Sequence, residues 1–111
     1  MVTVLEQDML TIKKAPRIFL PSAREATNTV FADHGFFEAA SIRKIGTTYY
    51  FIYSSEHGHE LCYATSQNPC KGFCYRGVIV SNGDIGYQRR KKPLNYTGTN
   101  HGSIEKIGDQ W

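Results

Sequence analysis

The amino-acid sequence predicts an all-β chain, a partial β-propeller with one complete four-stranded antiparallel blade and pieces of its two neighbours. Residues 36–80 hold consecutive apolar, aromatic and β-branched runs separated by short turns. A pattern that begins at Ser41 returns at Ser103, and repeats of this kind are typical of propellers. Aromatic residues make up 13% of the chain, and most are tyrosine or phenylalanine, which favour strands.

Size and composition limit the kinds of protein that this chain can be. Its 111 residues suffice for one small domain, and a hydrophobic fraction of 41% is typical of a globular chain. The formal net charge of +3 is too small to indicate a nucleic-acid partner. No apolar run approaches the roughly 20 residues that a membrane helix needs. We therefore expect neither a nucleic-acid nor a membrane partner, and the oligomeric state stays open.

The N-terminus and the cysteines bear on the cellular compartment. The first residues contain no basic segment followed by an apolar core, so no signal peptide is visible and a cytoplasmic location is favoured. Cys62, Cys70 and Cys74 are an odd number of thiols, which argues against a complete disulfide framework and favours a reducing compartment.

Residues 1–33 are predicted to be the end of the preceding blade and a linker. Short apolar runs at residues 2–5 and 9–12 predict two strands joined by a turn, and residues 17–20 predict an extended exit. The polar stretch that follows is expected to be a loop with one helical turn, in which Ser22 is the N-cap.

The central part of the chain is predicted to be the complete blade. Its four expected strands cover residues 36–45, 48–55, 60–66 and 73–80. The first two flank the short turn Gly46-Thr47, which is a hairpin signal. Turn-forming clusters separate the later strands, so consecutive strands are expected to pair as an antiparallel meander.

The C-terminal part is predicted to be a polar loop followed by the start of the next blade. Residues 81–100 form the loop, which contains the basic run Arg89-Arg90-Lys91-Lys92. Residues 101–111 repeat the serine, isoleucine, lysine, isoleucine and glycine that begin at Ser41, at an offset of 62 positions (103 − 41). Because one repeat cannot bury its apolar face alone, we expect the chain to be a piece of a longer protein.

Glu38 is the candidate catalytic residue that the residue pattern suggests. It stands among Phe36, Phe37, Ala39 and Ala40. Burial among apolar side chains disfavours the charged form of a carboxyl group, which suits a general acid that works near neutral pH. The structural alternative is a solvated Glu on an exposed strand face, paired with a nearby cation.

Two motifs resemble glycoside hydrolase family 43. The glutamate-bearing segment Phe36-Phe37-Glu38-Ala39-Ala40-Ser41-Ile42-Arg43-Lys44-Ile45-Gly46 resembles the third blade of that family, and Asn100-His101-Gly102-Ser103-Ile104 resembles the start of its fourth blade. The strand around Tyr63 and the run Gly77-Val78-Ile79-Val80 also fit the blade pattern. The resemblance covers roughly residues 5–111, from the end of blade 2 to the start of blade 4.

The resemblance implies a five-bladed propeller that hydrolyses O-glycosyl bonds in plant cell-wall carbohydrate such as xylan or arabinan, as β-xylosidases and α-L-arabinofuranosidases do. It implies an inverting mechanism with three carboxylates, in which Glu38 is the general acid. The aspartates that serve as general base and as modulator of the acid are expected upstream of Met1. This chain alone is therefore expected to be inactive, although its partner is expected to be a xylo- or arabino-oligosaccharide.

The resemblance also implies roles for a histidine and two aromatic residues. His101 matches a histidine that lines the central channel, where family members often hold calcium. Calcium prefers oxygen ligands, so we expect a channel-lining role rather than direct ligation, with no cofactor needed for the chemistry. Phe36 and Phe37 are candidates for the apolar wall of a sugar subsite, with core packing as the alternative.

Three other functions stay open at this point. A small zinc-binding module would use His57, His59, Cys62, Cys70 and Cys74, although their spacing matches no ordinary zinc pattern. A nucleic-acid site would use the basic run 89–92 with Tyr87 and Tyr96, against which the small net charge argues. A non-catalytic propeller remnant that still binds carbohydrate is the third.

Overall fold

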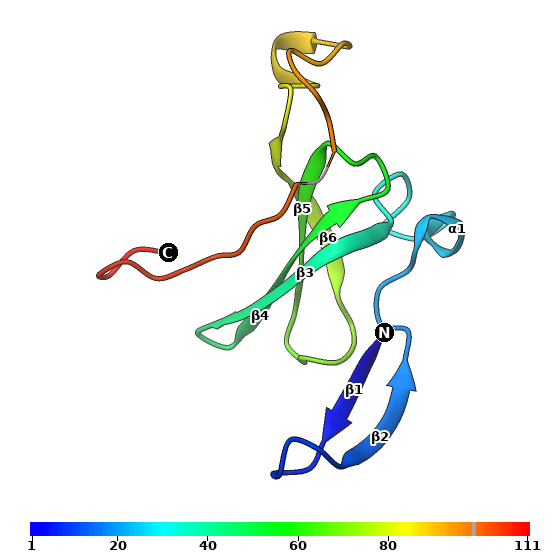
Figure 1. Ribbon diagram of the computed structural model, residues 1–111, viewed down its shortest axis with the longest axis vertical. Coiled ribbons are helices and arrows are strands. Elements are labelled where there is room, and N and C mark those ends of the chain that lie inside the picture. The colour runs from blue at the N-terminus through cyan, green and yellow to red at the C-terminus, as the bar shows by residue number, and fades with distance from the viewer. Residues whose placement is uncertain (99) are drawn as a thin grey trace.

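The computed structural model describes residues 1–98 and 100–111, and nearly all of its regular structure is β (Figure 1). A two-stranded and a four-stranded sheet contain β1 (Val2–Leu5), β2 (Ile12–Arg17), β3 (Phe36–Ile45), β4 (Thr48–Ser55), β5 (Glu60–Ser66) and β6 (Cys74–Ser81). One helical turn, α1 (Ala23–Ala26), joins the sheets, and the 3₁₀ turn Tyr87–Arg89 follows β6. No helix in the described ranges is long and apolar enough to cross a membrane.

The four-stranded sheet confirms the predicted antiparallel blade. Its strand order is β3-β4-β5-β6, so each strand pairs with the next one in the sequence. The turn between β3 and β4 places Gly46 at a φ of 59°, a left-handed conformation that glycine adopts without steric cost. The pairs Phe36 with Ser55 and Glu60 with Ser81 lie at one end of the sheet. The start of β3, the turn after β4 and the loop after β6 therefore share that end.

The N-terminal hairpin is shifted from its predicted position. The expectation of a strand over residues 9–12 is wrong, because Met9 and Leu10 lie in the turn and β2 begins at Ile12. The Asp8 carboxylate accepts hydrogen bonds from the backbone N–H groups of Leu10 and Thr11, both at 2.9 Å. Asp side chains favour turns through bonds of this kind, so local turn chemistry prevails over the apolar pattern.

The core lies against one face of the central strands. Its buried side chains are Leu20, Ala26, Phe31, Phe51, Tyr53, Cys62, Ala64 and Phe73. The ring of Phe19 contacts the edges of Phe51 and Phe73, with centroids 5.1 and 5.6 Å apart. Phe73 was predicted to begin the fourth strand, but β6 begins one residue later, and the Phe73 ring packs in this core instead. The linker thus covers the sheet.

The helical turn has the predicted cap. The Glu25 carboxylate accepts hydrogen bonds from the Ser22 backbone N–H at 3.0 Å and from the Ser22 hydroxyl at 2.9 Å. This half of a capping box satisfies a donor that the first turn leaves unpaired. It positions Ala26, which is 1% exposed, against the core.

The repeat seen in the sequence recurs in the backbone. Ile107 forms an isolated antiparallel bridge with Gln110, and Gly108 between them has a φ of 60°. The equivalent pair in the first copy is Ile45 with Thr48, around Gly46. Both copies therefore form the same turn. The assignment of residues 101–111 to a further blade stays a prediction.

We expect Gly35→Ala to destabilise the chain. A Cβ atom at Gly35 would lie 2.7 Å from the backbone nitrogen of Ala23, so the linker would have to shift. Overpacking of this kind costs about 1–3 kcal/mol, measurable as a lower midpoint in urea unfolding. Gly46→Asn is the control, because its surroundings are open and asparagine tolerates left-handed φ. Equal midpoints for the two variants would contradict the proposed clash.

Candidate active site

Glu38 lies in an irregular part of the edge strand β3. It pairs with Ser54 between two shifts of register, with Phe36 opposite Ser55 before it and Ser41 opposite Ile52 after it. The next residue, Ala39, has a φ of 60°, which is rare for a residue with a Cβ atom. Bulges of this kind bend a strand and redirect a side chain, and they are over-represented next to active sites.

The surroundings of Glu38 differ from the predicted apolar enclosure. The side chain is half-buried, Phe37 is 63% exposed, and Ala40 is exposed. The prediction that all its neighbours bury this carboxyl group is therefore wrong within this chain. The reason is that the burial of β3 alternates along the strand, with Phe36 packed against the core and Phe37 and Ala40 exposed.

The two candidate subsite phenylalanines have different surroundings. The ring of Phe36 lies 6.0 Å from the rings of Phe51 and Tyr53, measured between centroids. These contacts support core packing for Phe36. Phe37 has no such ring contact among the described residues and is 63% exposed. Phe37 alone is placed to contact a ligand.

The fold brings the segment before His101 next to Glu38. The Ser54 hydroxyl donates a hydrogen bond of 2.6 Å to the Asn100 side-chain oxygen, and Ser54 is the cross-strand partner of Glu38. His101 follows directly and is exposed. Two motifs separated by more than 60 residues in the sequence thus meet at one edge of the sheet.

A buried polar network occupies the same end of the sheet. The Glu60 carboxylate accepts hydrogen bonds from Ser55 Oγ at 2.8 Å, from His34 Nδ1 at 2.8 Å and from Cys62 Sγ at 3.6 Å. Burial raises the pKa of Glu60, but the bonds from Ser55 and His34 and the charges of His34 and His57 outweigh burial and lower the pKa. Glu60 is therefore a paired carboxylate whose role is structural.

Among the residues that the structure describes, the alternative zinc ligands His57, His59, Cys62, Cys70 and Cys74 are not brought together. Within residues 1–98 and 100–111, the one group of three potential metal ligands whose ligand atoms lie within 4.8 Å of one another is His34, Glu60 and Cys62. Cys62 is thus the sole predicted ligand in that group. Cys70 lies in the turn after β5, at the opposite end of that strand from the turn that holds His57 and His59. All three cysteines are free thiols.

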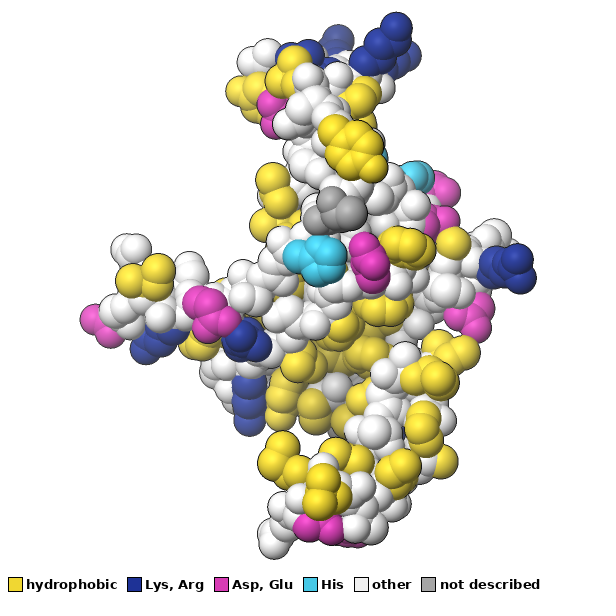
Figure 2. Space-filling view, in the orientation of Figure 1, with side chains coloured by type: hydrophobic (Ala, Val, Ile, Leu, Met, Phe, Trp, Pro, Cys, Tyr) yellow, Lys and Arg dark blue, Asp and Glu magenta, His cyan; other side chains and the backbone are white. Residues whose placement is uncertain are grey.

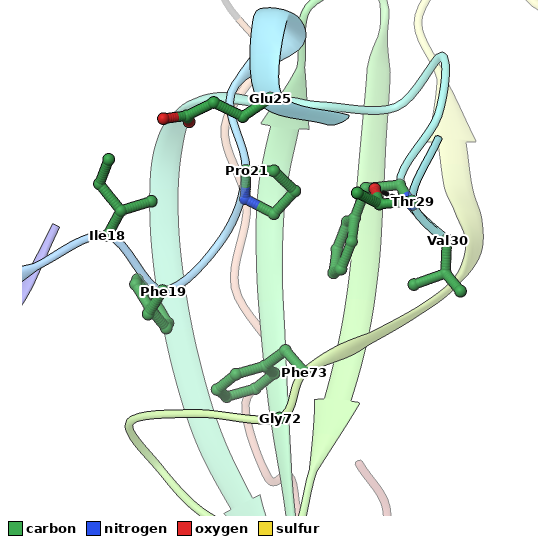
Figure 3. Close-up of a pocket in the computed structure, with 9 residues that line it drawn as sticks. Ile18, Phe19, Pro21, Glu25, Thr29, Val30, Gly72 and Phe73 are labelled. Carbon is green, nitrogen blue, oxygen red and sulfur yellow. Dashed lines mark hydrogen bonds between the residues drawn. The ribbon is translucent and has the colours of Figure 1, made fainter. Parts of the chain in front are cut away.

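An apolar pocket lies away from Glu38. Figure 3 shows this pocket, of about 540 Å³, between the linker and the sheet. Its lining residues are Ile18, Phe19, Pro21, Glu25, Thr29, Val30, Phe31, Gly72 and Phe73. Most of these side chains are apolar and several belong to the core, so the pocket is a gap in packing rather than a catalytic site.

Comparison with known proteins finds relatives that share the name xylosidase/arabinosidase. No family model matches the chain. A protein from Thermoclostridium stercorarium named xylosidase/arabinosidase is 55% identical over the whole chain, and one of the same name from Bacteroides ovatus is 30% identical over 99% of it. The chain spans 24% and 35% of the length of these relatives.

A solved structure that is similar to this chain has a description consistent with the names of these relatives. CoXyl43, described as a GH43 β-xylosidase/α-arabinofuranosidase from a compost microbial metagenome, matches with a TM-score of 0.67 and 30% identity. The match covers 96% of the chain and 29% of CoXyl43, whose structure is a complex with xylotriose in a calcium-free form.

We expect acid to weaken the fold through Glu60. Its pKa is lowered in the folded chain, so its contribution to the free energy of unfolding is full above the ordinary value of 4.5 and is lost as pH falls through the folded value. Glu60→Gln should cost about 1–3 kcal/mol at pH 7 and should flatten the fall in urea midpoint below pH 5. Glu6→Gln, on the exposed hairpin, is the control. An unchanged acid response in Glu60→Gln would contradict this role.

We expect Cys62 to resist alkylation in the folded chain. Burial and the negative charge of Glu60 raise the pKa of its thiol to about 12, from an ordinary value of 9.0. At pH 8 its thiolate fraction is then roughly a thousandfold lower than that of an ordinary thiol. Iodoacetamide followed by peptide mapping should label the exposed Cys74 first and Cys62 only in urea. Equal labelling of both residues without urea would show that the core is open.

Proposed function

We propose that this chain, which is similar to a GH43 β-xylosidase/α-arabinofuranosidase over 96% of its length, supplies the general acid Glu38 of an inverting glycosidase. The observation that supports this most directly is the bulge at Glu38. Ala39 holds a left-handed conformation that costs about 1–2 kcal/mol, and strain of this kind is concentrated at functional sites.

The proposed reaction divides the work between two carboxyl groups. Protonated Glu38 donates its proton to the glycosidic oxygen as that bond breaks. A second carboxylate removes a proton from a water molecule that attacks the opposite face of the sugar ring. Inverting enzymes hold these groups about 6.5–9.5 Å apart, which leaves room for the water. We place the second carboxylate and the modulating aspartate outside these 111 residues, so this chain should be inactive alone.

We propose xylan-type or arabinan-type oligosaccharides as substrates. Two relatives are named xylosidase/arabinosidase, and CoXyl43 is in complex with xylotriose. Phe37 has the exposed ring that a sugar face can contact, whereas Phe36 is occupied in the core. We assign His101 to the wall of the same site, since the neighbouring Asn100 contacts the cross-strand partner of Glu38.

We propose no calcium ligand among the described residues. In the two ranges that the structure covers, no group of three potential metal ligands includes His101, and calcium needs six to eight oxygen ligands. We therefore assign no step to calcium. We also propose that residues 1–33, 36–80, 81–100 and 101–111 are the end of one blade, a full blade, a loop and the start of a third.

The test is to graft this chain into the Thermoclostridium stercorarium relative, in place of the matching segment, and to assay aryl β-xylosides and aryl α-L-arabinofuranosides. Glu38→Gln should lower kcat about 10²–10⁴-fold when the leaving group is a poor one such as phenol. The loss should be much smaller for dinitrophenol, because its oxygen leaves without a proton.

Glu6→Gln is the matched control, since it makes the same change on the exposed hairpin. Two results would contradict the proposal. One is a folded graft with no activity on either sugar. The other is a loss in Glu38→Gln that is the same for both leaving groups, because removing a general acid must affect the poorer one more.

A further inference from the structure

The segment after β6 forms a closed loop with a basic tip. The N–H of Leu94 donates a hydrogen bond of 2.9 Å to the carbonyl of Gly83, and we call residues 83–94 the basic loop. Its base is tied by the Asn82 side chain, which donates to the carbonyl of Gly98 at 3.1 Å. Compact loops whose ends are joined in this way frequently carry function.

The charge of the basic loop is almost entirely positive. Arg89, Arg90, Lys91 and Lys92 follow one another, and Asp84 is the one acidic residue between Gly83 and Leu94. None of the ion pairs in the described part of the chain includes these four cations. Figure 2 shows Lys and Arg side chains gathered at the tip that projects from the sheet. The tip therefore attracts an anion.

Two exposed tyrosines accompany these cations. Tyr87, within the basic loop, is 63% exposed, and Tyr96, two residues beyond it, is 84% exposed. An aromatic ring with a polar tip can contact an apolar face and a hydroxyl group of the same ligand. This combination suits a sugar better than it suits a simple ion.

Unsatisfied polar atoms are concentrated in the same segment. Buried side-chain nitrogen or oxygen atoms without a hydrogen-bond partner, among residues 1–98 and 100–111, are Asn82 Oδ1, Arg90 Nε and Asn100 Nδ2. All three lie on the basic loop or at its base. A buried polar group without a partner is costly, so a ligand with both donors and acceptors would stabilise a rearranged loop. A sugar hydroxyl group can act as a hydrogen-bond donor and as an acceptor.

The basic loop starts from the end of the sheet that holds Glu38. Ser81, the last residue of β6, pairs with Glu60, and Phe36 at the start of β3 pairs with Ser55. The chain then returns at Asn100, which contacts Ser54, the cross-strand partner of Glu38. A saccharide bound at Glu38 therefore has the base of this loop beside it.

We propose that the basic loop binds the carboxylate of a uronic acid branch on a xylo-oligosaccharide. Arginine and lysine form charge-assisted hydrogen bonds to a carboxylate, and the guanidinium group can do so with two parallel bonds. Nucleic acid is another anionic ligand whose rings could stack on the two tyrosines, but a net charge of +3 favours a ligand with one or a few charges. This inference rests on the proposed function, because it names the substrate of the same site.

The test measures binding by the full chain to xylotetraose with one glucuronic acid branch and to unbranched xylotetraose, by calorimetry at low and at physiological salt. We expect at least tenfold tighter binding of the branched sugar, reduced by salt, since the charges are exposed. Arg89→Gln with Lys91→Gln should remove this preference. The control is Lys14→Gln with Lys106→Gln, which removes the same amount of charge outside the basic loop. This variant should retain the preference for the branched sugar.

Limited trypsin digestion gives a second measurement, because trypsin can cleave within the basic loop. The branched sugar should slow cleavage after residues 89–91, and unbranched xylotetraose should not. Equal affinity for the two sugars, an equal loss in both double variants, or tighter binding of a dodecathymidylate would overturn the proposal. Binding needs no catalysis, so an inactive graft, or a Glu38→Gln loss that is equal for both leaving groups, with this preference intact would overturn the glycosidase alone.

Discussion

The buried carboxylate of Glu60 is the interaction on which one end of this fold depends. Glu60 is 8% exposed at the first position of β5, and a charge in that position is tolerated only when it is paired. His34 and Ser55 provide the pairing, from the turn before β3 and from the end of β4. Removing one partner would leave a buried charge, so the three segments hold together as a unit.

The start of β3, and with it Glu38, is positioned by bonds around that carboxylate. The Tyr53 hydroxyl donates to the carbonyl of His34 at 2.8 Å, and the N–H of Gly35 donates to Glu56 at 3.1 Å. The turn that precedes the candidate acid is therefore fixed on both sides. The bulge at Ala39 begins directly after this fixed region, so the redirected side chain starts from a defined place.

The regular strands of the blade could be predicted from the sequence, since period and turn signals are local. The third predicted strand, residues 60–66, coincides with β5. The turn at Asp8 was predicted, but not its extension over Met9 and Leu10, although the spacing of Asp8 from Leu10 and Thr11 carries the signal. The pairing of His34 with Glu60 spans 26 residues, and the bulge at Ala39 depends on strand register. A local sequence pattern carries no information on this pairing or on this bulge. For that reason the polar network was not predicted, and the surroundings of Glu38 differ from the predicted apolar enclosure.

The two copies of the repeat are joined by an ion pair between equivalent positions. Arg43 of β3 contacts Glu105, and these residues occupy the same place in the two copies. Two identical units would bring arginine against arginine here and would repel each other. Opposite charges at these equivalent positions therefore favour contact between the two different copies over contact between two identical ones.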